Sequence, residues 1–176
     1  MNKAKTKIIT DFATWTAFSA ARRSPIRSQE DLTKLINKPD YEKILRNKKV
    51  NSSSFTRWHR TSVKKIKQAA GTGFSYGWAA KLINVYLKSR VYLGGENRLC
   101  LISYLHPPID QYLIAGLKEE VRKMGGEEHH LDTLKKYKSI VKIDKKFYEN
   151  LIAVFREISK EKNCKLIELE QFWKWN

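Results

Sequence analysis

Apolar residues recur at helical spacing along most of the chain, and no segment alternates apolar and polar residues as an exposed strand does. Phe12, Trp15 and Phe18 are spaced three apart and predict a first helix over residues 8–21, which Ser24-Pro25 ends. The segment SYGWAAKLINVYLKSRVYL, which begins at Ser75, is apolar over much of its circumference and predicts a central helix. Further helices are predicted over residues 28–37, 41–45, 54–70, 109–124 and 145–162, and in the tail from residue 166. The expected fold is all-α, a compact bundle of about eight helices.

Several segments lack a clear helical pattern. The run LCLISYL, residues 99–105, is short and apolar, and it fits a strand, a buried loop or a helical turn. Residues 127–142 mix acidic and basic side chains and are expected to be exposed. Residues 51–54, Asn-Ser-Ser-Ser, are expected to form a loop or a helix cap. Gly71-Thr72-Gly73 breaks the chain before the central helix.

The composition is that of a folded protein. Of the 176 residues, 41% are hydrophobic and 11% aromatic, which supplies one core and excludes a disordered polycation. We expect a single helical domain over residues 1–176, with basic N-terminal helices in 1–70 and the core and C-terminal helices in 71–176. No stretch approaches the roughly 18 apolar residues of a membrane span, and no apolar segment follows the lysines that come after Met1. We therefore expect a soluble, cytoplasmic monomer without membrane contact.

The charge is strongly positive and unevenly placed. The net charge is +17, and residues 1–70 hold 17 of the 35 basic residues but only 5 of the 18 acidic ones. Such a field attracts polyanions, and aromatic residues lie among the cations, so we expect a nucleic acid as partner, with double-stranded DNA favoured. A solubility device and an anionic membrane surface are the alternatives. The residues expected to contact backbone phosphates are Arg22, Arg23, Arg57, Arg60, Lys64 and Lys65.

Cysteine and histidine spacing gives no sign of a metal centre. Cys100 and Cys164 are far apart and not in a CxxC pattern, so we expect reduced thiols. The four histidines include no HxxxH pair. We expect no bound metal and no cofactor.

Lys81 and Asp110 are the candidate catalytic residues. Lys81 lies within the apolar run WAAKLIN, and burial disfavours the charged form of an amine, which makes an amine a nucleophile near neutral pH. Asp110 follows Pro107-Pro108 at the start of a predicted helix, where free N–H groups and the helix dipole favour an ionised carboxylate. An amine and a carboxylate side by side can break an N-glycosidic bond. The alternatives are a lysine on a solvated helix face and an aspartate that only caps a helix.

Residues 79–117, AAKLINVYLKSRVYLGGENRLCLISYLHPPIDQYLIAGL, resemble the helix-hairpin-helix DNA glycosylase superfamily, and most of all its archaeal 8-oxoguanine branch. In that branch a nucleophilic lysine early in an apolar helix precedes a Pro-x-Asp element, and Lys81 and Asp110 match these two positions. The family hairpin reads Leu-Pro-Gly-x-Gly, whereas this chain offers Gly71 and Gly73, whose N–H groups would then hold a phosphate. The four-cysteine cluster of some relatives is absent.

The resemblance implies a helix-hairpin-helix glycosylase-like fold and a bifunctional DNA glycosylase that excises a flipped-out, oxidised purine. Lys81 would form a Schiff base with the deoxyribose, Asp110 would assist, and β-elimination would nick the strand. Asn84 and Lys88 lie on the same helical stripe as Lys81 and would contact the nucleotide or its phosphate. The aromatic residues expected to hold the base are Phe172 and Trp175, with Trp173, Trp15 and Trp58 as further candidates.

Two other functions fit the same sequence. The first is a non-catalytic nucleic-acid-binding protein with a glycosylase-like core, associated with phage defence or a mobile element. The second is a metal-dependent nuclease or toxin, for which the only acidic residues near His129 and His130 are Glu119, Glu120, Glu127, Glu128 and Asp132.

Overall fold

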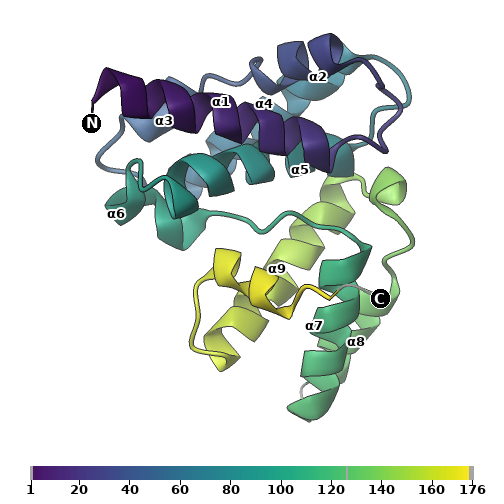
Figure 1. Ribbon diagram of the computed structural model, residues 1–176. Helices are drawn as coiled ribbons and strands as arrows, with labels where there is room; N and C mark the ends of the chain where they lie inside the picture. Colours follow the sequence, from purple (N-terminus) through teal and green to yellow (C-terminus); the bar gives the residue numbers. More distant parts are fainter. Residues whose placement is uncertain (1, 126, 175–176) are drawn as a thin grey trace.

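The computed structural model describes residues 2–125 and 127–174, and this part of the chain is helical with no strand (Figure 1). The prediction of an all-α fold is confirmed. The described residues form nine α-helices: α1 (Lys3–Ala20), α2 (Gln29–Ile36), α3 (Tyr41–Leu45), α4 (Ser52–Ala70), α5 (Tyr76–Leu87), α6 (Arg98–Leu101), α7 (Gln111–Lys123), α8 (Glu128–Lys135) and α9 (Lys145–Glu161). Four short segments complete them: the π-helical turn η1 (Lys88–Leu93) and the 3₁₀ segments η2 (Ile102–Tyr104), η3 (Ile140–Lys142) and η4 (Leu166–Phe172).

Helix α5 is the centre of the packing. It contacts α1, α4 and α9, and every one of its residues except Lys81 is buried. The sequence predicts this central position, because a helix that is apolar around most of its circumference must be buried on all sides. Lys81 is therefore the only residue of α5 that is partly exposed to solvent.

Polar caps define where the helices begin. Ser28, Ser75, Asp110 and Asp144 each accept a hydrogen bond from the backbone of the first turn that follows. Helix α4 begins two residues earlier than predicted, at Ser52, because Asn51 is its cap and forms a reciprocal capping box with Ser54.

Other segments differ from the expectation. Helix α1 begins five residues earlier than predicted, at Lys3, because Asn2 is its cap. The stretch 127–142 is not simply exposed: it contains α8, which buries His130 and Leu134, spaced four apart, against α9. The tail from Leu166 forms 3₁₀ turns rather than an α-helix. The ambiguous run 99–105 is a helical turn, made of α6 and η2.

The segment from Leu105 to Ile109 crosses from the helices around α5 to the group formed by α7, α8, α9 and η4 (Figure 1). It has no regular structure, yet all five of its residues are buried. A buried irregular segment must find partners for its backbone groups, and Pro107 and Pro108 reduce that need because proline has no N–H. The two prolines also make the backbone rigid just before Asp110, which is the N-cap of α7.

The C-terminal segment η4 lies against α7 and α9. Gly116 of α7 permits this approach, because a Cβ there would lie 1.7 Å from the carbonyl oxygen of Phe172. Lys174, just after η4, pairs with Glu119 of α7 at 2.5 Å, and Lys162, the C-cap of α9, pairs with Glu120 of α7 at 3.0 Å. Trp173, which also follows η4, reaches Asp110 at the start of α7.

The buried apolar side chains form one cluster that includes residues of α1 and α4 as well as α7 and α9. Within the described residues, no helix is long and apolar enough to cross a membrane.

Candidate active site

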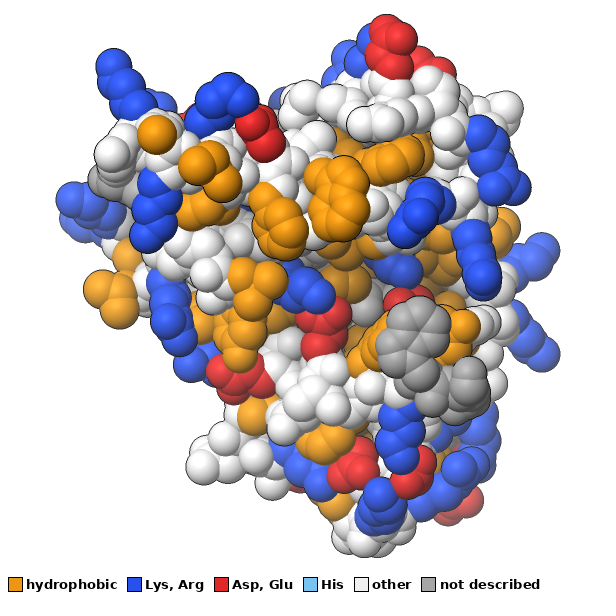
Figure 2. Space-filling view, in the orientation of Figure 1, with side chains coloured by type: hydrophobic (Ala, Val, Ile, Leu, Met, Phe, Trp, Pro, Cys, Tyr) orange, Lys and Arg blue, Asp and Glu red, His pale blue; other side chains and the backbone are white. Residues whose placement is uncertain are grey.

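Lys81 and Asp110 meet at the edge of α5. The Lys81 Nζ atom lies 3.1 Å from Asp110 Oδ2, and the two side chains are 12% and 20% exposed. The residues are 29 positions apart in the sequence, and they are brought together because Lys81 projects from the middle of α5 while Asp110 caps α7. In Figure 2, basic and acidic side chains are set back in a hollow between the helices around α1 and those around α7. The pair is partly covered, yet solvent reaches both groups.

Both carboxylate oxygens of Asp110 are engaged. Oδ2 accepts from Lys81, while Oδ1 accepts from the backbone N–H groups of Tyr112 and Leu113, at 3.1 and 3.0 Å. Oδ1 also accepts from Trp173 Nε1 at 3.0 Å. Four donors hold this carboxylate in one orientation, which keeps Oδ2 aimed at the amine. The bond from Trp173 has no signal in the sequence, because it joins residues 63 positions apart.

A second pair of charges lies beside the first. Lys88 Nζ, in η1, is 2.9 Å from Glu170 Oε1, in η4. Burial raises the pKa of Glu170, the charge of Lys88 lowers it, and smaller effects come from Asp110, which raises it, and Lys81, which lowers it. The four groups therefore form one cluster of two cations and two anions. Lys88 is held by Glu170 and is not a free phosphate contact, contrary to the expectation.

Aromatic side chains surround the cluster. Trp78, one turn before Lys81, places its ring centroid 5.8 Å from Lys81 Nζ, and its own Nε1 is buried without a hydrogen-bond partner among the residues that the structure describes. Trp173 packs edge-on against Tyr112, with ring centroids 5.2 Å apart. Burial, and then the charge of Asp110, raises the pKa of Tyr137, so its hydroxyl stays protonated near the site. Trp78, Tyr112 and Tyr137 were not singled out from the sequence, since their spacing is that of ordinary core residues.

Asn84, which was expected to contact DNA, is a core residue instead. It is 2% exposed, and Oδ1 accepts from His59 Nε2 at 2.9 Å. Its amide nitrogen donates to the carbonyl of Pro107, at 3.1 Å, and to the hydroxyl of Tyr148, at 3.0 Å. The expectation fails because residues three apart on a helix differ by about 60° in direction, which is enough to place Lys81 at the edge and Asn84 inside. Through Pro107, Asn84 fixes the segment that carries Asp110.

The network around Asn84 is buried and uncharged. The Tyr148 hydroxyl accepts from Asn84 and is hydrogen-bonded to His106 Nδ1, at 3.0 Å. Burial lowers the pKa of His59 to about 4 and lowers that of His106 well below its ordinary value. Both histidines are therefore neutral at physiological pH, and neither is placed to act on a substrate at Lys81.

The expected base-binding residues are dispersed. Of the C-terminal aromatics, Trp173 reaches the candidate site, whereas Phe172 stacks under Lys162 of the α9 C-terminus, 5.3 Å from its Nζ. Trp175 lies outside the described residues. Trp58 donates to the carbonyl of Asp40 and packs on Tyr41 and Phe55, so it serves the N-terminal core rather than a base pocket. Trp15 is on α1, 58% exposed and next to Phe12.

The expected phosphate contacts lie on two elements. Arg22 and Arg23 are exposed in the turn after α1, and Arg57, Arg60, Lys64 and Lys65 are exposed along α4. Gly71 and Gly73 lie in the turn between α4 and α5 with φ of +76° and +93°, a region that favours glycine. The Gly71 N–H donates to Lys67 as the C-cap of α4, so it is not available to a phosphate, contrary to the expectation.

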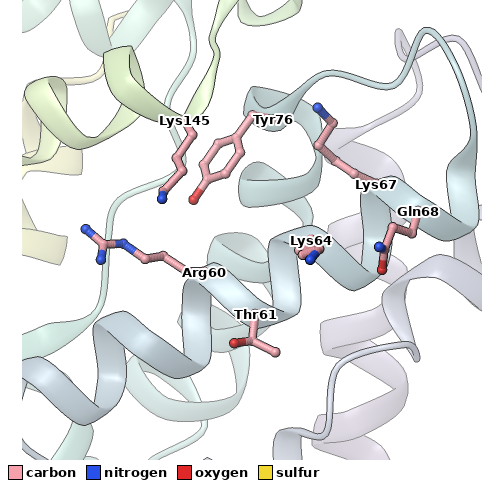
Figure 3. A pocket seen from close by; sticks show the side chains of 7 residues that line it. All are labelled: Arg60, Thr61, Lys64, Lys67, Gln68, Tyr76 and Lys145. Carbon is pink, nitrogen blue, oxygen red and sulfur yellow. The ribbon is translucent and has the colours of Figure 1, made fainter.

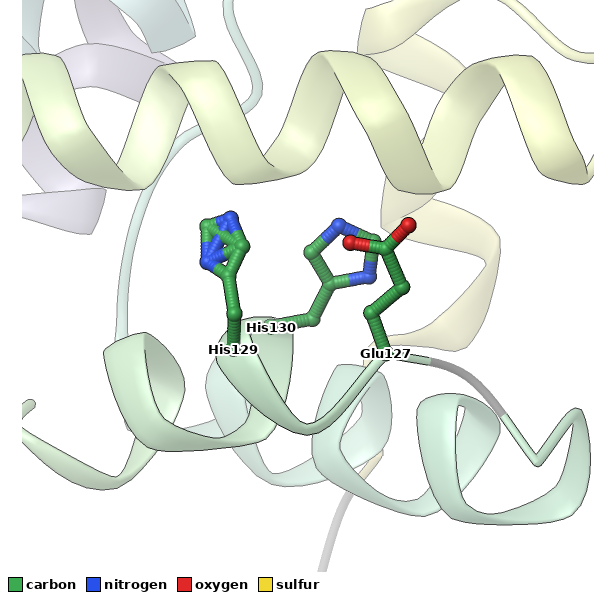
Figure 4. A group of neighbouring side chains, drawn as sticks. All are labelled: Glu127, His129 and His130. Atoms are coloured by element: carbon green, nitrogen blue, oxygen red, sulfur yellow. The ribbon is translucent and has the colours of Figure 1, made fainter.

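Glu127, His129 and His130, at the start of α8, form a group whose possible ligand atoms lie within 4.8 Å of one another (Figure 4). His130 is buried and its Nε2 is 2.8 Å from Glu157 of α9, while Glu127 and His129 are exposed. The group follows the C-terminus of α7, roughly 20 Å along that helix from Asp110. It is separate from the Lys81 site and has no part in its chemistry.

Comparisons with protein-family models, with curated proteins and with solved structures find no match to this chain. Function is therefore inferred from the geometry of the residues themselves and from the resemblance over residues 79–117.

Proposed function

We propose that the protein is a DNA glycosylase with lyase activity, in which Lys81 is the nucleophile and Asp110 its partner. The observation that carries the proposal is the 3.1 Å contact between Lys81 Nζ and Asp110 Oδ2. A nucleophile needs a group within hydrogen-bond reach that takes its proton, and Asp110 meets this condition. The resemblance of residues 79–117 to helix-hairpin-helix glycosylases supports the same roles for the same two residues.

The residues would act in a defined order. Asp110 accepts a proton from the Lys81 ammonium, and the free amine attacks C1′ of the deoxyribose as the bond from C1′ to the base breaks. The base leaves with the electron pair of that bond and takes up a proton. Opening of the sugar ring then gives an imine between Lys81 and C1′, and loss of a proton from C2′ expels the 3′-phosphate. Asp110 gives the proton that it received to the departing base, and the carboxylate so restored, held by the N–H groups of α7, stabilises the positive charge of the protonated imine.

The aromatic side chains beside the pair support a nucleobase as the group that is recognised. Lys81 is the only residue of α5 that is not buried, so a substrate approaches this helix at one point. Trp173 and Tyr112 are half-buried aromatic residues beside Asp110, and such rings hold an unstacked base. The base that we propose is an oxidised purine, as in the branch that the sequence resembles.

The helical hairpin of α4, the glycine turn and α5 is consistent with a glycosylase-like fold, which is part of the proposal. The exposed cations of α4 and the net charge of +17 supply the attraction for duplex DNA.

The test is borohydride trapping. Borohydride reduces an imine to a stable amine, so we expect the wild-type protein to become covalently attached to duplex DNA that contains 8-oxoguanine or an abasic site. Lys81→Gln removes the nucleophile and should abolish the adduct. Lys88→Gln is the matched control, because Lys88 is a second amine in the same charge cluster, paired with Glu170.

The outcomes separate the alternatives. If the wild-type protein forms no adduct with either DNA, the imine chemistry is wrong, and a protein that binds nucleic acid without acting on it becomes the better reading. If the Lys81→Gln protein still forms the adduct, the nucleophile is misassigned. Full activity in excess chelator is expected, and its loss would instead support the metal-dependent nuclease.

A further inference from the structure

A cavity of about 550 Å³ lies between the C-terminal half of α4, the first turn of α5 and the first turn of α9 (Figure 3). None of its lining residues belongs to the Lys81 cluster. The lining residues are Arg60, Thr61, Lys64, Lys67, Gln68, Tyr76 and Lys145.

The cavity is cationic. Four of the seven lining residues are basic and none is acidic. Glu149, on α9, lies 2.8 Å from Arg60 and 4.0 Å from Lys145, whereas Lys64 and Lys67 form no ion pair with any described residue. One carboxylate therefore faces four cations. Like charges gathered around a cavity repel one another, and an anion inside it removes that repulsion.

Tyr76 provides a directed hydrogen-bond donor in the cavity wall. The residue is 7% exposed, and its hydroxyl is buried without a hydrogen-bond partner among the described residues. Burial, and then the charge of Glu149, raises the pKa of Tyr76 to about 12, so the hydroxyl keeps its proton. Figure 3 shows Tyr76, Lys145 and Arg60 converging from α5, α9 and α4. A buried hydroxyl without a partner costs about 1–3 kcal/mol, which an acceptor bound in the cavity would offset.

Several cations beside one neutral donor match the oxygens of a phosphate group. The volume exceeds that of a bare phosphate and lies within the range of small-molecule sites, so a phosphate with its attached sugar fits. We propose that this cavity is a phosphate-binding site, in which Arg60, Lys64, Lys67 and Lys145 surround a phosphate ester and Tyr76 donates to it. The phosphate bound in the cavity is a backbone phosphate of the same DNA whose nucleotide reaches Lys81. This assignment of the ligand to DNA rests on the proposed function.

The first experiment uses inorganic phosphate and a nucleoside 5′-monophosphate as probes, at constant ionic strength with chloride as the reference. The melting temperature of the wild-type protein should rise with either probe. In Lys64→Gln/Lys67→Gln the affinity should fall by about tenfold or more, since two charge-assisted contacts are lost. Tyr76→Phe removes only the unpartnered hydroxyl, so it should fold normally and bind about three- to tenfold more weakly.

Lys65→Gln is the matched control. Lys65 is exposed on α4 next to Lys64 but does not line the cavity, so its loss should leave phosphate affinity unchanged. The proposal is overturned if neither probe binds, or if the Lys65 variant loses as much affinity per charge removed as the Lys64/Lys67 variant, because the effect would then be one of net charge.

The second experiment identifies the source of the phosphate. Binding of a labelled DNA duplex is measured by fluorescence anisotropy over a range of salt concentrations. If DNA occupies the cavity, the Lys64/Lys67 variant binds more weakly and the slope of log affinity against log salt falls by about one. If that variant loses nucleotide binding but binds DNA as the wild type does, the occupant is a free nucleotide and the DNA assignment is wrong.

Borohydride trapping keeps the two proposals distinguishable. Failure of trapping with intact phosphate binding rejects the lysine chemistry alone, whereas intact trapping without phosphate binding rejects the cavity alone.

Discussion

Helix α5 carries two polar residues three positions apart, and their surroundings differ in kind. Asn84 is enclosed in a neutral network in which His59, Tyr148 and the carbonyl of Pro107 satisfy its amide. Lys81 is charged, partly exposed and paired with one carboxylate. A buried amide with every bond made specifies packing, because any movement breaks a bond that water cannot replace. An ion pair at an edge, in contrast, can exchange its partner for a substrate.

The two regions are also connected. Asn84 donates to the carbonyl of Pro107, three residues before Asp110, so the neutral network sets the position of the carboxylate. On this one helix, Asn84 therefore belongs to a network that positions the site, whereas Lys81 belongs to the pair for which we propose a reaction. Substitutions in the first should lower stability, and substitutions in the second should lower activity.

Asp110→Asn gives the largest expected effect on activity. Asparagine caps a helix about as well as aspartate, so α7 and the melting temperature should change little. The proton acceptor is lost, and single-turnover base release should slow by about 100-fold or more. A variant that melts normally yet keeps wild-type rates would place Asp110 among the structural caps.

Asn84→Ala should show the opposite pattern, in which the main loss is of stability. It leaves His59, Tyr148 and the Pro107 carbonyl each without one partner, and the free energy of unfolding should fall by about 2–4 kcal/mol. Urea unfolding measures this loss, with Lys81→Gln as the comparison that is expected to change stability little. Equal losses of unfolding free energy in the two variants would contradict the distinction between Asn84 and Lys81.

The pH dependence of stability tests the neutral network directly. The pKa of His59 is about 4 in the folded protein and that of His106 is also lowered, against about 6.5 in an unfolded chain. Below pH 6.5 the unfolded chain therefore binds protons that the folded protein does not, so stability is full above pH 6.5 and falls with decreasing pH. His59 contributes about 1.4 kcal/mol per pH unit in this range, or about 2 kcal/mol between pH 6.5 and pH 5, and His106 contributes in the same direction.

His106→Asn isolates this contribution. Asparagine can still hydrogen-bond to Tyr148 but does not titrate, so the loss of stability between pH 7 and pH 5 should be measurably smaller than in the wild type. His129→Asn, at an exposed histidine of α8, is the control and should leave the pH profile unchanged. Parallel profiles for all three proteins would mean that His106 is protonated in the folded state.

How much of the fold and of the candidate site could be predicted from the sequence depends on whether the pattern lies within a few neighbouring residues. The lysine in an apolar helix and the aspartate after two prolines are each visible within a few residues, and so are the caps Ser28, Ser75 and Asp144. The contact between Lys81 and Asp110 follows from the resemblance. The α8 helix was missed because eight residues with two buried positions give only a weak period.

The rest depends on contacts between distant segments. The bond from Trp173 to Asp110 and the enclosure of Asn84 are set by how α5, α7 and η4 pack, and no local pattern encodes them. Likewise, the cationic cavity is built from three helices, and from the sequence its lysines look like any solvated face.

Trp173→Phe gives the smallest expected effect. It keeps an aromatic ring over the site but removes one of three donors to Asp110 Oδ1. Single-turnover base release should slow by about three- to tenfold, the worth of one hydrogen bond. Trp58→Phe, which changes the tryptophan that donates to Asp40, is the control and should leave the rate unaltered. A rate that rises in the Trp173 variant would show that the indole blocks access instead of orienting the carboxylate.

The close approach of Phe172 to Gly116 also bears on the order in which the molecule is completed. Lys81 and Asp110 are both translated well before η4, so the ribosome releases the reacting pair ahead of the segment that finishes its surroundings. Until η4 and Trp173 dock on α7, Asp110 has its contacts with Lys81 and with the N-terminus of α7 but lacks the hydrogen bond from the Trp173 indole. Maturation of the site is thereby coupled to the synthesis and docking of η4.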